Sequence, residues 1–171
     1  RVCSECGEKE TSAIDRLGGT SIIACSTEDK SCGENLVWVL YFDGTLKIIG
    51  KGKMTDFADA ESTPWYEYSD KITAVIAEDG VESIGAYAFT GCRNLKKVTW
   101  TDSVKSIGQY AFGRCSSLAE LTLPEKLESI GYYAFYYDSA LTHISFGKTV
   151  SHIGSNAFVG CSALTAIEFA D

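Results

Sequence analysis

The sequence contains little proline, little methionine and no long apolar run. Its 171 residues include 2 Pro and 1 Met. The longest apolar run, Leu36 to Phe42, is far shorter than the roughly 18 residues that a membrane-spanning helix needs. We therefore expect no membrane insertion. The chain opens with Arg1 rather than Met, so we expect it to be a processed or excised piece of a longer protein.

Basic residues are also scarce. Fifteen Lys and Arg stand against 23 Asp and Glu, for a net charge of −8. Their scattered distribution argues against a nucleic-acid-binding groove or a patch for anionic membranes. A hydrophobic content of 45% and an aromatic content of 12% exclude a disordered chain. The length suits one domain, or one plus a short appendage, that buries roughly 70% of its unfolded surface.

A 23-residue repeat occupies residues 72–171. Within a repeat, Val98 and Trp100 alternate with polar residues, as in a strand with one buried face. The segment 109–115 suits a short helical or 3-10 turn. One unit cannot bury its apolar stripe alone, so we predict a parallel solenoid of stacked units. The recurring motifs are Ser83-Ile84-Gly85, Ser106-Ile107-Gly108, Ser129-Ile130-Gly131 and His152-Ile153-Gly154, an Ala-Phe pair ending at Phe89, Phe112, Phe135 and Phe158, and a column of Cys92, Cys115, Asp138 and Cys161.

The four glycines of the Ile-Gly pairs are expected where the backbone needs a positive φ or a close approach. A stripe of apolar residues includes one Leu per repeat, at Leu95, Leu118, Leu141 and Leu164. Together with Ile-Gly, Ala-Phe and Cys at fixed offsets, it resembles the BspA-like leucine-rich repeat, a variant found in bacterial cell-surface proteins. The resemblance implies a horseshoe-like solenoid at the cell surface or outside the cell, with binding or adhesion roles. It covers residues 72–171.

Residues 32–71 are predicted to form an N-terminal β-hairpin cap. Two β-rich runs, 36–42 and 45–49, flank the hairpin signal Asp43-Gly44. A solenoid end needs a cap, and the turn and aromatic residues of 62–66 would add a plug before the first repeat. Residues 1–31 form a cysteine-containing leader or linker. The side chains expected to cover the open core are Trp38, Leu40, Leu46 and Ile48.

The cysteines divide into two groups. Those of the repeat column are expected to be buried thiols, because Cys packs there as a small hydrophobe. Four more lie in the leader and at the first position of the cap, and disulfides among them are favoured. A zinc site, for which half of the signature is present, and free thiols stay open. These four cysteines are Cys3, Cys6, Cys25 and Cys32.

Two surfaces are candidate binding sites. Stacking aligns outward strand positions into continuous polar ladders that suit hydrogen bonding to a peptide or glycan. Tyrosines crowd the third repeat, and aromatic residues are enriched in contact surfaces. Tyr87, Tyr110 and Tyr133 share one column and are expected to pack between repeats. The candidate binding residues are Lys97, Thr99, Glu120, Thr122, His143, Ser145, Tyr132, Tyr136 and Tyr137.

No catalytic site, cofactor or metal is expected. Glu120, His143 and Ser145 share a face, but two residues along a strand are about 6.6 Å apart, whereas a nucleophile and its base need roughly 2.6 to 3.2 Å. A repeat sheet also lacks an oxyanion hole. The acidic corner residues show no calcium-loop pattern and are expected to be solvated. They are Glu78, Asp79, Asp102 and Glu125.

The sequence therefore predicts a non-enzymatic binding or adhesion module whose partner is an extracellular protein or glycan. The alternative is a structural spacer within a larger repeat array. The last strand, near Phe169, has no cap. We expect the natural protein to continue with more repeats; otherwise the open edge would pair end to end with another chain.

Overall fold

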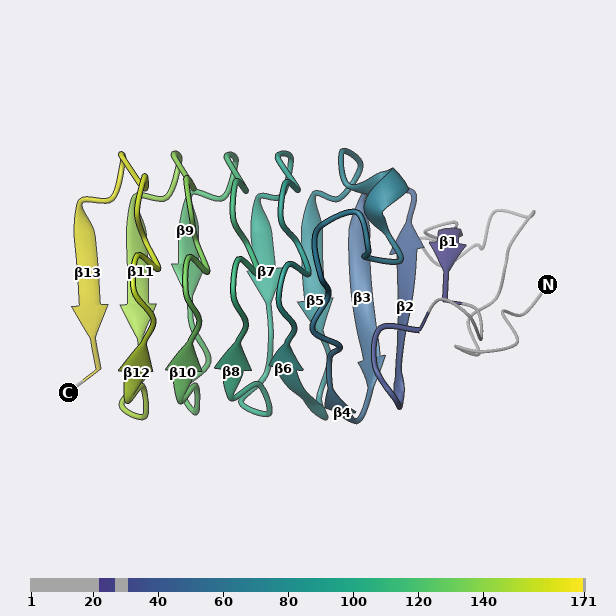
Figure 1. Cartoon of the computed structure of the whole chain (residues 1–171), viewed down its shortest axis with the longest axis horizontal. Helices are drawn as coiled ribbons and strands as arrows, with labels where there is room; N and C mark the ends of the chain where they lie inside the picture. Colours follow the sequence, from purple (N-terminus) through teal and green to yellow (C-terminus); the bar gives the residue numbers. More distant parts are fainter. Residues whose placement is uncertain (1–21, 27–30, 171) are drawn as a thin grey trace.

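A computed structural model describes residues 22–26 and 31–170. The strands stack side by side along the long axis, with β1 and β13 at opposite ends of the stack (Figure 1). Two layers of strands enclose the core. One layer contains two sheets, with the strand orders β1-β2-β3-β5-β7 and β13-β11-β9. The other layer is one sheet with the order β12-β10-β8-β6-β4. The elements are β1 (Ile22–Cys25), β2 (Leu36–Tyr41), β3 (Thr45–Gly50), β4 (Gly52–Lys53), η2 (Tyr66–Tyr68), β5 (Ala74–Ala77), β6 (Val81–Ile84), β7 (Lys97–Thr99), β8 (Ser106–Ile107), β9 (Glu120–Thr122), β10 (Ser129–Ile130), β11 (His143–Phe146), β12 (His152–Ile153) and β13 (Ala166–Phe169).

The N-terminal hairpin is confirmed. Gly44 has a φ of +83°, and the Asp43 carboxylate accepts the N–H of Thr45 at 2.9 Å, which fixes the turn. β2 and β3 pair antiparallel, and β3 then pairs parallel with β5, the first repeat strand. The four residues expected to cover the core, Trp38, Leu40, Leu46 and Ile48, are all buried.

A stack of aromatic rings runs through the core. Phe89, Phe112, Phe135 and Phe158, one from each repeat, stack with centroids 5.2 to 5.6 Å apart. Trp65, from the predicted aromatic plug, continues the stack, 5.5 Å from Phe89. Its indole N–H donates to the Ala88 carbonyl at 2.7 Å, so its polar atom is satisfied inside the core.

Three Ser-Ile pairs and the equivalent His152-Ile153 form a second parallel sheet that was not expected from the sequence. β6, β8, β10 and β12 pair in register, with each Ile opposite the next. Ile84, Ile107 and Ile130 are buried, whereas Ile153 is 42% exposed. The paired segments of three of these strands are two residues long. Such strands are too short for a period of two to be visible in the sequence.

The segments after each Ile-Gly pair are chains of turns rather than continuous helices. Thr90 and Cys92 donate their N–H groups three residues back, to Tyr87 and Phe89, while the N–H groups of Phe89 and Gly91 donate to the next repeat. Helical bonding is interrupted because residues such as Tyr87 take a left-handed φ of 58°. Backbone hydrogen bonds therefore join the turns of successive repeats.

The motif glycines are required for close approach, not for positive φ. A Cβ on Gly131 would lie 2.6 Å from the backbone nitrogen of Gln109, and one on Gly108 would lie 2.5 Å from that of Ala86. The backbones of successive repeats therefore touch at this column. The left-handed conformation occurs two residues later, at Tyr87, Tyr110, Tyr133 and Asn156.

The column cysteines are thiols. Cys92 and Cys115 are buried, and burial raises the pKa of Cys92 to about 12. Cys161 is only partly buried, and its pKa rises to about 11. Burial likewise raises the pKa of Cys115 well above its usual value, so all three thiols are protonated at neutral pH.

The favoured disulfide prediction for the leader is wrong for Cys32, which is a buried free thiol that packs in the core. A small apolar-like side chain fills this position of the cap. Cys25 lies in β1, and Cys3 and Cys6 lie outside the described residues. Within residues 22–26 and 31–170, no group of His, Cys, Asp and Glu could hold a metal ion.

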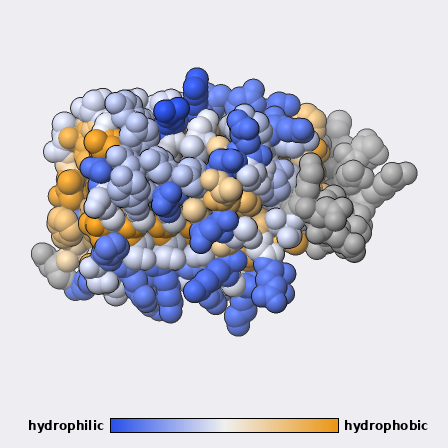
Figure 2. Space-filling view, viewed as in Figure 1, coloured by the Kyte–Doolittle hydropathy of each residue, from blue (hydrophilic) through white to orange (hydrophobic). Residues whose placement is uncertain are grey.

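None of the helical segments in the described part of the chain has the length and apolar character needed to cross a bilayer. Figure 2 shows hydrophobic colour gathered at the C-terminal end of the solenoid. There Ile167 and Phe169 of β13 are 52% and 68% exposed. The stripe that is buried in the earlier repeats is therefore open to solvent in the last one.

Candidate functional site

The predicted sheet-face residues come from three neighbouring strands. Lys97 and Thr99 lie on β7, Glu120 and Thr122 on β9, and His143 and Ser145 on β11. All six point away from the core because they alternate with buried or partly buried residues such as Leu121 and Ile144. In register, His143 lies opposite Glu120, and Ser145 opposite Thr122.

The predicted continuous ladder is wrong at one step, because β7 and β9 belong to different sheets. Trp100 follows β7, where the next two repeats have Leu123 and Phe146. Its indole N–H donates to the Thr122 carbonyl at 2.8 Å, and its ring packs edge-on against Phe112. A side chain thus bonds a β9 carbonyl that would otherwise face the neighbouring strand. Lys97 and Thr99 are separated from the other four residues by this break.

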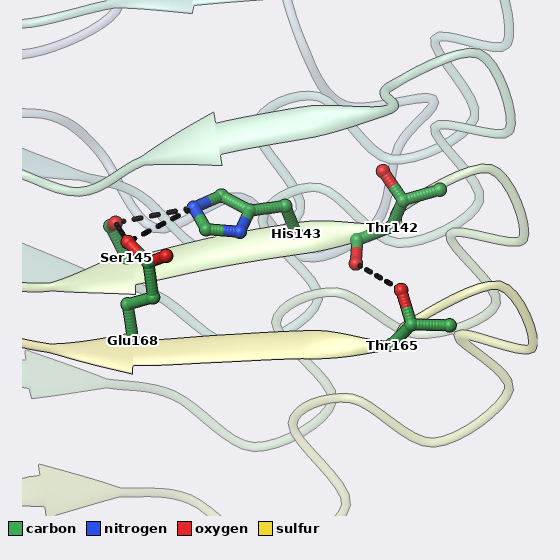
Figure 3. Close-up of polar contacts among 5 residues, drawn as sticks. All are labelled: Thr142, His143, Ser145, Thr165 and Glu168. Carbon is green, nitrogen blue, oxygen red and sulfur yellow. Dashed lines mark hydrogen bonds and ion pairs between the residues drawn. The ribbon is translucent and has the colours of Figure 1, made fainter.

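His143 and Ser145 are in contact, contrary to the expectation from strand spacing. Ser145 Oγ lies 3.4 Å from His143 Nε2, and it donates to Glu168 Oε2 at 3.3 Å (Figure 3). The same carboxylate oxygen lies 3.6 Å from Nε2. The backbone spacing is as expected, but the two side chains lean toward each other. The acidic partner is Glu168 of β13.

This cluster does not have the geometry of a catalytic triad. A triad places the hydroxyl and the carboxylate on different imidazole nitrogens, so that one orients the ring while the other gives up a proton. Here both contact Nε2, and the hydroxyl donates to the carboxylate. Beside it, Thr165 Oγ1 donates to the Thr142 carbonyl at 3.3 Å (Figure 3). The arrangement is cross-strand polar pairing.

The tyrosine column packs between repeats, as predicted. Tyr87 and Tyr110 stack at 5.1 Å, and Tyr110 and Tyr133 stack at 5.0 Å. Desolvation raises the pKa of Tyr110, and a hydrogen bond with Tyr132 raises the pKa of Tyr133. Both phenols are therefore neutral at physiological pH.

The three predicted binding tyrosines surround this column. Tyr132 and Tyr136 meet the Tyr133 ring edge-on at 4.1 and 5.0 Å. Tyr132 is 42% exposed and Tyr137 is 54% exposed, while Tyr136 is partly buried. We call Tyr132, Tyr136 and Tyr137 the tyrosine edge. The rings are held by their neighbours and still face solvent.

Two arginines beside the tyrosine edge were missed by the sequence analysis. A cavity of about 540 Å³ is lined by Arg93, Arg114, Ser116, Tyr136 and Tyr137. The Arg114 guanidinium lies over the Tyr136 ring, 5.8 Å from its centroid. Scattered basic residues gave no patch in the sequence. The available signal was the repeat itself, which places Arg93 and Arg114 in adjacent turns.

Asp138 lies beneath these turns, in the cysteine column. It is fully buried, and its Oδ1 accepts the backbone N–H of Cys115 at 2.8 Å. In the described part of the chain, its Oδ2 has no hydrogen-bond partner. Burial raises the pKa of Asp138 to about 8, against hydrogen bonds from the N–H groups of Cys115 and Arg114. The carboxyl is thus largely protonated at neutral pH.

Two of the acidic corner residues, Glu78 and Asp102, contact groups of the protein itself. Glu78 pairs with Lys47 at 3.5 Å, and Asp102 Oδ1 accepts the N–H of Glu125 at 3.0 Å. Asp79, Asp102 and Glu125 are exposed. They are spread over successive repeats rather than gathered around one point.

Comparison with known proteins identifies the repeat. Residues 62–171 match the family described as BspA type leucine rich repeat region, in six copies. The chain belongs to this family. No curated protein matches the sequence.

Solved leucine-rich repeat proteins share the fold of this chain. One from Eubacterium ventriosum is 28% identical with a TM-score of 0.66, over 86% of this chain and 45% of that one. One from Bacteroides ovatus is 37% identical with a TM-score of 0.55, over 57% and 25%. The T. pallidum leucine-rich repeat protein is 26% identical with a TM-score of 0.58, over 81% and 70%. The chain thus spans less than half of the first two proteins.

Proposed function

We propose that this BspA-type chain is a non-enzymatic binding or adhesion module of a bacterial surface protein, located at the cell surface or outside the cell. The observation that carries the proposal is the tyrosine edge, where two rings stay about half exposed although each packs against neighbouring tyrosines. Rigid aromatic side chains bind partners at a low entropic cost. Family membership supports the location, because the BspA-like repeat occurs in bacterial cell-surface proteins.

The partner is an extracellular protein or a glycan. The sheet face offers hydroxyls and charges from Lys97, Thr99, Glu120 and Thr122, and these side chains suit hydrogen bonding at the rim of a contact. His143 and Ser145 already contact Glu168, so they have less free hydrogen-bonding capacity. We therefore place the main contact on the tyrosine edge and a secondary one on the sheet face.

The test is binding of the chain to an array of glycans and extracellular-matrix proteins. Replacing Tyr132, Tyr136 and Tyr137 together by Ala should abolish the strongest signal. Tyr66→Ala is the matched control, because Tyr66 is 43% exposed but lies at the N-terminal end, in η2. Equal binding by the triple variant would contradict the aromatic contact. No binding by the unaltered chain would favour the structural spacer instead.

End-to-end association through β13 is a further part of the proposal, for the case in which no further repeat of the natural protein covers this strand. Its exposed Ile167 and Phe169 and its unpaired edge would pair with the same strand of a second copy. Sedimentation at rising concentration should then show dimers. A strictly monomeric solution would contradict this branch and leave the tyrosine edge unaffected.

A further inference from the structure

The two arginines beside the tyrosine edge are uncompensated charges in an acidic chain. The sequence has four arginines, and the two within the described residues, Arg93 and Arg114, line the same cavity. Both are exposed, and neither has an ion-pair partner within residues 22–26 and 31–170. A local positive site in a chain of net charge −8 favours an anionic ligand.

The backbone of these turns is held in place before any ligand binds. The N–H of Arg114 donates to the Tyr136 carbonyl at 2.6 Å, and the N–H of Tyr137 donates to the Val159 carbonyl at 2.9 Å. The Arg114 guanidinium rests over the Tyr136 ring. A ligand would therefore order few groups on binding, which lowers the entropic cost.

Two lining side chains occupy backbone positions that favour glycine. Gly91, Arg114, Tyr137 and Gly160 share one repeat column, and all have a positive φ, between 58° and 81°. Repeats one and four use glycine there, so the turn does not need a side chain. Arg114 and Tyr137 keep theirs at the cost of strain, and both line the cavity. Strained residues of this kind cluster at ligand sites.

From these observations we propose that the cavity binds a carboxylate-bearing sugar of an acidic glycan. Guanidinium groups pair with carboxylates by charge-assisted hydrogen bonds. Tyrosine rings offer flat faces that the C–H face of a sugar ring can cover, and the hydroxyls of Ser116, Tyr136 and Tyr137 can bond those of the sugar. This inference rests on the proposed binding role of the tyrosine edge and names the ligand class.

The test is calorimetric titration of the chain with tetragalacturonate at low salt. The fully methyl-esterified tetramer is the matched probe, because it keeps the sugar rings and loses the charges. We expect the acid to bind at least about tenfold more tightly than the ester, and its affinity to fall with added salt. Tetraglutamate should bind at least about tenfold more weakly than tetragalacturonate, because it offers carboxylates without sugar rings.

The matched variant is Arg114→Gly. Glycine occupies the same column at Gly91 and Gly160, so this variant should fold at least as well as the unaltered chain. It should weaken tetragalacturonate binding about tenfold or more. Lys148→Gln removes an equal charge from an exposed residue that does not line the cavity, and it should leave binding unchanged.

Several results would overturn the inference. Equal binding of acid and ester would show that the site does not recognise the carboxylate charge. Equal binding of tetraglutamate and tetragalacturonate would show that the site does not recognise the sugar ring. Unchanged binding by Arg114→Gly would remove the arginine from the site. If tetragalacturonate does not bind while the tyrosine edge still carries the array signal, the ligand class is wrong and the proposed function stands. If the array signal also survives the triple tyrosine substitution, both fail.

Discussion

The sheet face and the turn edge of this solenoid, the latter being the tyrosine edge together with Arg93 and Arg114, arise from the same 23-residue stacking but expose different chemistry. On the sheet face, His143, Ser145 and Glu168 satisfy one another across strands. On the turn edge, Arg93 and Arg114 have no acidic partner in the described part of the chain, and Tyr137 is more than half exposed. Regular stacking sets positions on both faces. Residues that differ between repeats, such as Arg114 in the column of Gly91, decide which face has free binding groups.

The largest expected effect tests how closely the turns pack. In Gly131→Ala, the new Cβ would lie 2.6 Å from two backbone atoms of the preceding repeat. We expect a loss of about 3 kcal/mol or more in the free energy of unfolding, because backbone cannot yield as a side chain can. Urea unfolding measures it.

The control for Gly131→Ala is Gly91→Ala on the same edge. No atom lies within 4 Å of a Cβ there, but φ is +80°. Only the conformational penalty of about 1 kcal/mol applies. Equal losses for the two variants would contradict the close-approach account.

The next effect concerns Asp138 beneath the turn edge. Its pKa is raised from 3.8 to about 8, so the folded chain holds this proton more tightly than the unfolded chain does. Its contribution to stability is complete below about pH 4 and is lost as the pH rises through about 8. Asp138→Asn should remove this dependence and stabilise the chain at pH 9 by a few kcal/mol. Melting temperatures at pH 5, 7 and 9 measure it, and parallel profiles for both chains would refute a buried titrating carboxyl.

A smaller effect separates binding from folding at the turn edge. Arg114 has a φ of 64°, so Arg114→Gly should raise the free energy of unfolding by up to about 1 kcal/mol. The same variant should lose affinity for the acidic sugar. Chemical unfolding and titration of one preparation measure both. A destabilised Arg114→Gly would mean that the arginine side chain supports the turn rather than a ligand.

The smallest effect is expected on the sheet face. His143→Ala removes a side chain that is 32% exposed and lies 3.6 Å from Glu168. Exposed pairs of this kind contribute about 0.5 kcal/mol or less. Urea unfolding at pH 6 and 8 should therefore differ little between the variant and the unaltered chain. A loss above about 2 kcal/mol would show that this cluster supports the fold.

Much of the fold could be predicted from the sequence because the same residue pattern recurs in each 23-residue repeat. The hairpin at Asp43-Gly44, the core positions of Trp38 and Leu46, and the tyrosine column were all expected and are confirmed. The second sheet was missed because its paired segments are mostly two residues long. The ladder break was missed because strand spacing does not reveal it, nor the hydrogen bond that the Trp100 indole makes at that step.

The candidate site was harder to predict, because its key features depend on side-chain conformations. Strand spacing gave the backbone distance between His143 and Ser145, but not the lean that brings their side chains to 3.4 Å. The arginine cavity needed the placement of Arg93 and Arg114 around Tyr136. Asp138 could have been noticed as the one charged residue in a cysteine column, and only burial shows its consequence.

The most direct measurement compares the two faces in one binding experiment. The turn-edge variant replaces Tyr132, Tyr136 and Tyr137 by Ala, and the sheet-face variant replaces Lys97, Glu120 and His143 by Ala. Both are probed on the same glycan and matrix-protein array, with folding checked by circular dichroism. We predict that the turn-edge variant loses the signal and that the sheet-face variant keeps most of it, because the sheet face supplies only the secondary contact. Loss by the sheet-face variant with full binding by the turn-edge variant would contradict the account.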